Sequence, residues 1–346
     1  MTALNNCHND LIPRTILLDY IKLYKCIGNC SKFVDELDRN SNLYHKLTIE
    51  EDITYCFNMF FKDHKLSDTR IKQFLNKKAG FVPKTYEENV FVNLMNIFEL
   101  IHSDNKFILS TREIQDLGLM IYKNTKDKNN TIRKHNANEQ SVSVSLDELV
   151  NEYNRIKSTD TIEYLYLNIS FIVDFIHLRP LKNGNEIVAS ILLYILLLSS
   201  DISALKYSSF FKALSSKKEE YNDSILKALY LYDAGYSDTS FLLKLIIKLS
   251  IELFENVKNL SKVVEFDSKL RKSETVETVI YKLDEKFTKD EIRRKLPNVS
   301  DSTIDRCLKE LQDEGKIISY GRGRCAYWIR LDHSHDEGID FLHENT

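Results

Sequence analysis

Apolar side chains recur every three or four residues along most of the chain, which is the spacing of an amphipathic helix. After Tyr86, for example, Val90, Leu94, Ile97 and Ile101 fall on one helical face. Such patterns predict helices over residues 15–37, 48–62, 86–101, 111–121, 147–156, 161–178, 186–199 and 205–258. Residues 140–146 differ, because their strict alternation of polar and apolar side chains predicts a strand. We therefore expect a mainly α chain.

Composition supports a globular, helical protein. Gly and Pro together make up 13 of 346 residues (9 and 4), so loops are few, and the hydrophobic fraction of 43% is enough for a large core. The net charge of −3 means that any contact with nucleic acid would need a local basic patch. The most apolar run, Ile187–Leu198, is shorter than the roughly 20 residues of a membrane span, so we expect no membrane partner.

The six cysteines are sparse and follow no secreted-scaffold spacing. We interpret them as reduced thiols, which favours a cytoplasmic location. Cys26 and Cys30, with Cys7 and His8 upstream, allow a zinc site as an alternative. A single Cys-x3-Cys on a helical stretch favours plain packing, so we expect no metal.

The segment Phe175–Ser190 is the strongest candidate for a binding or catalytic site. It reads as the end of one helix, a short loop and the start of a very apolar helix, with the loop sequence Arg-Pro-Leu-Lys-Asn-Gly-Asn over residues 179–185. Backbone N–H groups at a helix start can cradle an anion, so Asn183, Gly184, Asn185 and Glu186 form a candidate anion or nucleotide loop.

This layout resembles the Fic (Fido) family, whose motif His-Pro-Phe-x-Asp/Glu-Gly-Asn-Gly-Arg-x-x-Arg lies between two such helices. The resemblance covers about residues 45–260. It identifies Thr131–Arg133 with the entry to a β-hairpin flap, the alternating residues 140–146 with the flap itself, and residues 207–221 with a downstream Ser and Glu-Tyr stretch. It implies a Fic-like helical bundle that transfers AMP from ATP, with Mg²⁺, to a protein hydroxyl.

The residues that would perform this chemistry are replaced. Aligned through Pro180, Gly184 and Asn185, the general-base His falls on Arg179, and the acid that holds Mg²⁺ falls on Asn183. A guanidinium stays protonated and takes no proton, and a neutral amide is a weaker ligand for Mg²⁺. The second Gly falls on Glu186, and the two phosphate-clamping arginines fall on Ile187 and Ser190. We therefore predict a catalytically degenerate pseudoenzyme that acts by binding and needs no cofactor.

An active protein adenylyltransferase with ATP and Mg²⁺ is the alternative, with His177 as base and Arg179 on the phosphates. His177 lies two residues before Arg179, and side chains at this spacing point away from each other on a helix. A structural role for His177 in packing is therefore favoured over a role as base. Arg179 either binds an anion or caps the carbonyls of its helix. Thr48 and Asp52 have the spacing of a Ser/Thr-x-x-x-Glu pattern that often blocks the nucleotide site in these families, with Asp in place of Glu.

Residues 273–331 predict three helices and a hairpin, and they resemble the winged helix-turn-helix domains of bacterial regulators. The segment carries 12 Lys/Arg and 11 Asp/Glu over residues 274–331, a net of +1 that is a mediocre surface for phosphates. The DNA-binding candidates are Arg306, Lys309, Arg322, Arg324 and Arg330. A protein-interaction module is the alternative, and a transcription regulator that uses the Fic-like part for dimerisation or sensing is a third interpretation of the whole chain.

The predicted organisation is a helical region (1–84), a Fic-like core (85–260), a linker (261–272), a winged helix (273–331) and an acidic tail (332–346). We expect a protein partner, with DNA possible through the winged helix and a homodimer possible.

Overall fold

The computed structural model describes residues 1–7, 12–40, 42–61, 66–76, 82–103, 107–135, 141–296, 299–321 and 326–331. The described chain is mainly α-helical with one small antiparallel sheet, as the sequence predicted. It divides into two compact units, Met1–Ser261 and Lys262–Thr346. Residues 261–272, which were predicted to be a linker, belong to one continuous helix, Ser240–Lys282. The division between the two units falls inside this helix.

The first unit is built from helices throughout. Their bounds are α1 (Thr2–Asn6), α2 (Arg14–Asn40), α3 (Asn42–Phe60), α4 (Asp68–Leu75), α5 (Tyr86–Ile101), α6 (Thr111–Ile121), α7 (Val142–Thr159), α8 (Tyr164–Leu178), α9 (Asn185–Leu198), α10 (Phe210–Ser216), α11 (Lys218–Leu229) and α12 (Ser240–Lys282), with 3-10 turns η1 (Ser203–Lys206) and η2 (Tyr232–Ala234). Polar side chains cap several of these helices: Ser110 accepts a hydrogen bond from the Glu113 amide, and Thr85 and Glu88 make a capping box.

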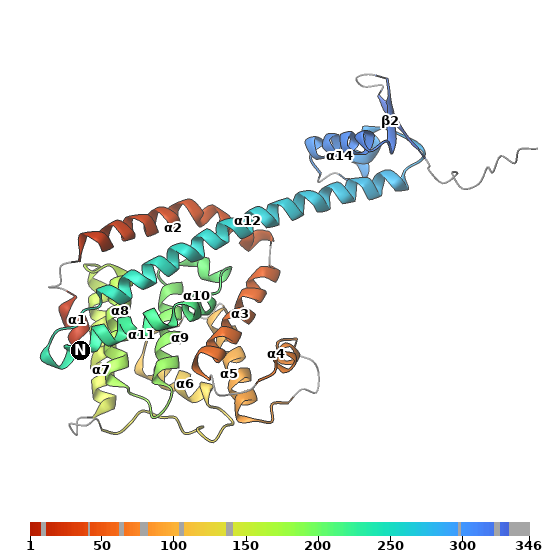
Figure 1. Cartoon of the computed structure of the whole chain (residues 1–346). Coiled ribbons are helices and arrows are strands. Elements are labelled where there is room, and N and C mark those ends of the chain that lie inside the picture. Colours follow the sequence, from red (N-terminus) through yellow and green to blue (C-terminus); the bar gives the residue numbers. More distant parts are fainter. Residues whose placement is uncertain are drawn as a thin grey trace, which may run out of the picture. The chain divides into compact units, whose positions relative to one another are not determined.

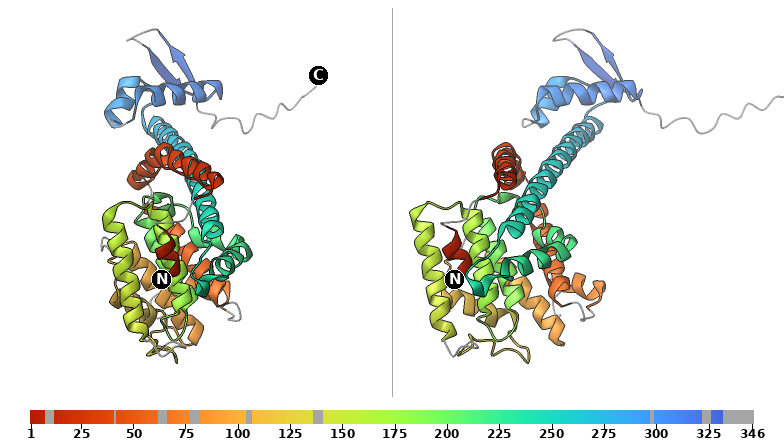
Figure 2. Two further views of the ribbon diagram at one scale, coloured as in Figure 1. Left: turned by 90° about the vertical axis from the view of Figure 1, so that its left-hand side faces the viewer. Right: turned by 60° about the vertical axis from the view of Figure 1, so that its left-hand side comes forward.

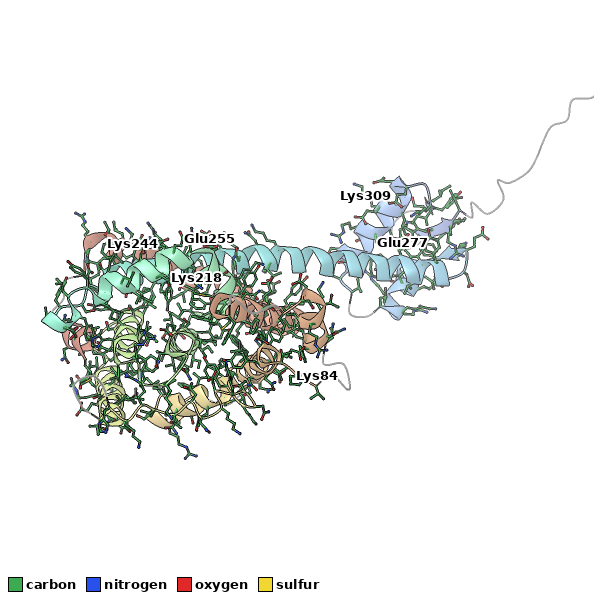
Figure 3. All side chains as sticks on the ribbon, turned by 60° about the horizontal axis from the view of Figure 1, so that its bottom comes forward. Lys84, Lys218, Lys244, Glu255, Glu277 and Lys309 are labelled. Atoms are coloured by element: carbon green, nitrogen blue, oxygen red, sulfur yellow. The ribbon has the colours of Figure 1, made fainter. Side chains whose placement is uncertain are left out.

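Helices α8 and α9 form the centre of this unit (Figure 1). All side chains from Leu165 to Phe175 are buried, and so are all from Ile187 to Leu197. A helix that is apolar on every side must be covered on every side. Helix α7 packs against α8, and α3 and α6 contact α9. Side chains fill the space between the helices (Figure 3), and the two views of Figure 2 show α2 at one edge of the unit.

The predicted strand over 140–146 is wrong for residues 142–146, which form the first turns of α7. Val142 and Leu146 are both fully buried, because residues four apart share a helical face, whereas Val144 is half exposed. The polar–apolar alternation thus fits a helix as well as a strand. Near the expected flap, the described residues form only isolated bridges, Ile132 with Leu181 and His135 with Ser141.

The second unit contains the C-terminal part of α12, α13 (Lys289–Lys295), α14 (Asp301–Asp313) and the strands β1 (Lys286–Phe287), β2 (Ile317–Tyr320) and β3 (Tyr327–Arg330). The strands pair antiparallel in the order β1-β3-β2. A separate core includes Val276, Ile280, Phe287, Ile304 and Leu311. Helices α13 and α14 and the strands β2 and β3 lie where the sequence predicted two helices and a hairpin, whereas β1 was not predicted. The winged-helix interpretation of the unit stays a prediction.

Candidate functional site: the loop between α8 and α9

The loop between α8 and α9 is shaped by two residues with positive φ. Arg179 ends α8 at φ 46°, and Gly184 precedes α9 at φ 67°. A side chain at 184 would also collide with Tyr122, because a Cβ atom there would lie 2.3 Å from the Tyr122 hydroxyl oxygen. Glycine at 184 is therefore required by both backbone and packing.

Buried amide side chains hold the backbone of this loop. The side chain of Asn185 accepts a hydrogen bond from the Leu181 amide and donates one to the Leu181 carbonyl, both at 2.8 Å. Asn130 does the same for Asn183, at 2.8 Å and 3.0 Å, and also donates to the carbonyl of Gly118. The Asn183 amide is thus already hydrogen-bonded within the protein.

Residues 131–133 run alongside the loop. The Arg133 amide donates to the Pro180 carbonyl at 2.8 Å, and the Lys182 amide donates to the Thr131 carbonyl at 3.3 Å. The Arg133 guanidinium donates to the carbonyls of Leu178 and Arg179, at 2.8 Å and 2.7 Å. The last carbonyls of α8 are therefore capped by Arg133, a role that the sequence left open for Arg179 beside anion binding.

Arg179 instead forms an ion pair across the loop. Its Nη2 lies 2.8 Å from Oε1 of Glu186, and both side chains are more than half exposed. Glu186 stands in the first turn of α9, where the helix dipole favours a negative charge. An anion that approached Arg179 would have to compete with this carboxylate.

The two positions that align with phosphate-clamping arginines point into the protein. Ile187 is 2% exposed and Ser190 is fully buried, with its hydroxyl 3.4 Å from that of Tyr221. Because both side chains are buried, neither can contact a ligand bound at the surface of the loop.

His177 lies against η2. Its ring stacks on Tyr232 with centroids 3.8 Å apart, and its Nε2 lies 3.1 Å from Oδ1 of Asp233. Of the candidate site residues, Arg179 thus forms an ion pair with Glu186, and Asn183 is hydrogen-bonded to Asn130. His177 contacts residues of η2.

Solved structures identify the architecture, while no protein-family model and no curated protein matches the chain. A Fic family protein from Desulfovibrio desulfuricans G20 is similar with a TM-score of 0.54 at 12% identity, over 96% of this chain and 99% of that one. A fragment of Fic-1 from C. elegans is similar with a TM-score of 0.52 at 16% identity, over 70% of this chain and 73% of that one. A variant of that fragment gives 0.50 at 17% identity, over 71% and 74%.

This chain has the Fic fold. The resemblance inferred from residues 175–190 thus agrees with a comparison of coordinates that uses no motif. In this Fic-fold chain, the loop at 179–185 joins α8 to α9 as the motif pattern predicted.

Two carboxylates are buried elsewhere in this Fic fold, and the sequence singled out only one of them, Asp52, as part of the Ser/Thr-x-x-x-Glu pattern. Asp174 on α8 accepts hydrogen bonds from the amides of Ala3 and Leu4, at 2.9 Å and 3.0 Å, and from the Tyr232 hydroxyl at 2.5 Å. It thereby holds α1 against α8. An aspartate within an otherwise apolar helix, Phe171–Ile176, is the signal that could have found it.

Asp52 is the second buried carboxylate. It accepts hydrogen bonds from the Ser209 hydroxyl at 2.7 Å, the Phe211 amide at 2.8 Å and the Tyr194 hydroxyl at 3.3 Å, and so ties α3 to α9 and α10. Burial raises its pKa to about 7. The Tyr194 hydroxyl is also hydrogen-bonded to Nε2 of His102, at 2.7 Å. Thr48, the other residue of the Ser/Thr-x-x-x-Glu comparison, donates to the Tyr44 carbonyl on its own helix.

Two of the five DNA-binding candidates of the second unit, Arg306 and Arg330, have partners within the protein. Arg306 pairs with Glu310 at 3.6 Å, and Arg330 donates to the carbonyls of Ile280 and Leu283, at 3.0 Å and 3.3 Å. Lys309 is exposed on α14 (Figure 3). Arg322 and Arg324 lie outside the described residues.

Among the described residues, no group of three or more His, Cys, Asp and Glu side chains could hold a metal ion. Cys26 and Cys30 both lie on α2, and burial raises the pKa of each thiol. Within the described part of the chain, no helix combines the length and the apolar character that crossing a membrane needs.

Proposed function

We propose that this Fic-fold chain is a pseudoenzyme that acts by binding a partner protein and does not transfer nucleotides. The observation that carries the proposal is the Arg179–Glu186 ion pair above a loop whose clamp positions, Ile187 and Ser190, are buried. Cation and anion neutralise each other where a nucleotide phosphate would need uncompensated positive charge.

Proton chemistry supports the same conclusion. General-base catalysis needs a group that releases its proton near neutral pH, and an arginine side chain does not. His177 could take this role only if it reached the loop, and its ring is instead stacked on Tyr232. The amide of Asn183 offers Mg²⁺ a neutral oxygen where a carboxylate would be preferred.

For the second unit we propose contact with a protein, with DNA as the alternative. Ion pairs of Arg293 with Asp301 and of Lys289 with Asp305 join α13 to α14, and Arg293 also pairs with Asp290 on its own helix. Cations that are already paired release few counterions on binding DNA, so they add little affinity for phosphates. A mixed, nearly neutral face suits a protein surface better.

Labelled ATP tests the proposal. The purified chain is incubated with Mg²⁺, ATP labelled on the α-phosphate, and a cell extract, beside the same extract without the chain. We expect equal labelling of protein in the two samples. Labelling that requires the chain and disappears in Arg179→Ala or His177→Ala would overturn the proposal in favour of an active transferase.

A further inference from the structure

A cavity of about 560 Å³ lies in the first unit at the C-terminal end of α9, and we call it the α9 cavity. The loop at 179–185 is at the other end of this helix, about 20 Å away at 1.5 Å per residue. Pockets that hold small molecules have volumes of roughly 300–1,000 Å³. Most of the wall is apolar and comes from α5, α7, α9 and residues 107–109, with Ile101, Phe107, Tyr153 and Ile195 among its members.

Lys157 is the one charged side chain among the described residues of this wall. It stands in the last turn of α7, is exposed, and places its Nζ 5.8 Å from the centre of the Tyr153 ring. Within the described part of the chain it has no carboxylate partner, and Glu152 on the same helix is bound by Arg155 instead. The α9 cavity therefore combines an apolar interior with one unpaired cation at its edge.

The other polar side chains of the wall are hydrogen-bonded within the protein. The Tyr153 hydroxyl donates to Oδ1 of Asn168 at 2.7 Å, and the Ser199 hydroxyl donates to the Leu196 carbonyl at 2.8 Å. The Asn154 amide group donates to the Leu109 carbonyl at 3.4 Å. This leaves Lys157 as the group that can bind the polar end of a ligand.

Helices α7 and α9 both end beside the α9 cavity, and the carbonyls at a helix C-terminus disfavour anions. Here these carbonyls are capped. The Ile156 carbonyl accepts from the Thr159 hydroxyl at 2.7 Å, and the Leu197 carbonyl accepts from the Ser200 amide at 3.0 Å. Because their hydrogen bonds are made within the chain, these carbonyls counteract the charge of Lys157 less.

A second cavity, of about 320 Å³, adjoins the first because the two share part of their walls. The shared residues are Ile101, Phe107, Ile108 and Ile195. The wall of the second cavity contains Glu113 and Asp116 and, among the described residues, no cation. An apolar anion would therefore be repelled by the second cavity and attracted by the α9 cavity.

We propose that the α9 cavity binds a linear aliphatic carboxylate of the medium-chain fatty acid class. The alkyl chain lies in the apolar interior, and the carboxylate pairs with Lys157 at the edge. The chain supplies most of the affinity, because each CH₂ group that leaves water tightens binding about fourfold. An exposed ion pair adds up to about fivefold and sets the orientation of the ligand. This proposal is independent of whether the loop at 179–185 is inert.

Isothermal titration calorimetry of the full chain with octanoate, decanoate and dodecanoate tests the proposal. We expect one saturable site, with a dissociation constant that falls at least about fourfold for each added pair of carbons. Lys157→Met keeps the apolar stem and removes the charge, so it should weaken decanoate about three- to fivefold and change decanol less than about twofold. Ile108→Glu, at a 73% exposed wall residue, should weaken decanoate more than decanol.

Lys248→Met and Ile21→Glu are the matched controls, because they alter exposed side chains on α12 and α2 that line neither cavity. Both should bind decanoate as wild type does. Absence of saturable binding up to about 1 mM dodecanoate would overturn the proposal. So would an affinity that does not depend on chain length, or decanoate binding that Lys157→Met and Ile108→Glu leave unchanged while circular dichroism shows an intact fold.

Discussion

At the scale of single residues, Gly184 and Asn185 determine the shape of the loop between α8 and α9. Gly184 provides a positive φ and makes room for the Tyr122 hydroxyl, and Asn185 satisfies both polar backbone groups of Leu181. These roles concern backbone geometry. The fold alone therefore explains the glycine and the asparagine at these positions, and their presence is no evidence for catalysis.

Gly184→Ala should destabilise the first unit strongly. The left-handed backbone alone costs about 1–2 kcal/mol for alanine, and displacing Tyr122 adds about 1–3 kcal/mol of overpacking. We expect the Tm to fall by about 5 °C or more in differential scanning calorimetry.

Gly235→Ala is the matched control, because Gly235 also has positive φ, while a Cβ atom added there would meet no other atom within 4 Å. It should cost about 1 kcal/mol. Equal losses for the two variants would show that Tyr122 does not pack against the loop as described.

Asp52→Asn should change how stability depends on pH. Burial raises the pKa of Asp52 from 3.8 to about 7, so between these pH values the folded protein holds a proton that the unfolded chain has released. This contribution to stability falls as pH rises from about 4 to 7. The asparagine variant does not titrate, so we expect its Tm to improve relative to wild type on going from pH 5 to pH 8.

Glu88→Gln is the control for that measurement. Its hydrogen bonds with Arg70 lower the pKa of Glu88 to about 2, so its stabilisation is present above pH 4.5 and is lost only as pH falls towards 2. The cost of Glu88→Gln should therefore be equal at pH 5 and pH 8. An Asp52→Asn difference that is also the same at both values would contradict a buried, titrating Asp52.

At the scale of elements, the two central helices were predictable because apolar runs of this length fit a buried helix and are too long for a strand. Residues 161–178 and 186–199 gave α8 and α9 nearly to the residue. The strand over 140–146 failed because a period of two and a spacing of four coincide at Val142 and Leu146, and only packing decides between them. Likewise, nothing in the Asn-rich run at 129–130 shows that Asn130 binds a loop more than fifty residues away.

Asn130→Ala should loosen the loop without disturbing α8 and α9. The change removes the acceptor of the Asn183 amide and two donors to carbonyls, which we expect to cost about 2 kcal/mol. Hydrogen exchange of a peptide that spans residues 181–185 should become faster. The exposed neighbour Asn129→Ala is the control and should leave exchange unchanged, and equal exchange in both variants would remove Asn130 from the support of the loop.

At the scale of the whole molecule, the fold could be inferred from the sequence. The proposed lack of activity rests on positions where this chain differs from the family motif. The loop layout led to the Fic fold, which the coordinates of solved structures support at 12–17% identity. The electrostatic state of the site could not be inferred, because the Arg179–Glu186 pair and the burial of Ile187 depend on tertiary packing. The charge pairing between α13 and α14 was hidden for the same reason.

The pairing of α13 with α14 leads to a prediction about DNA. Fluorescence anisotropy with a duplex from the region upstream of the gene should show only weak, sequence-independent binding at 150 mM salt, and Lys309→Ala should change it little. Binding tighter than about 1 μM that Lys309→Ala weakens would favour DNA binding by the second unit.

The most direct test of the central claim is the intact mass of the purified chain after incubation with ATP and Mg²⁺. The account predicts an unchanged mass of 40.5 kDa, because Arg179 at the general-base position takes no proton and the two phosphate-clamp positions are the buried, uncharged Ile187 and Ser190. An added nucleoside monophosphate that is absent from Arg179→Ala would contradict it.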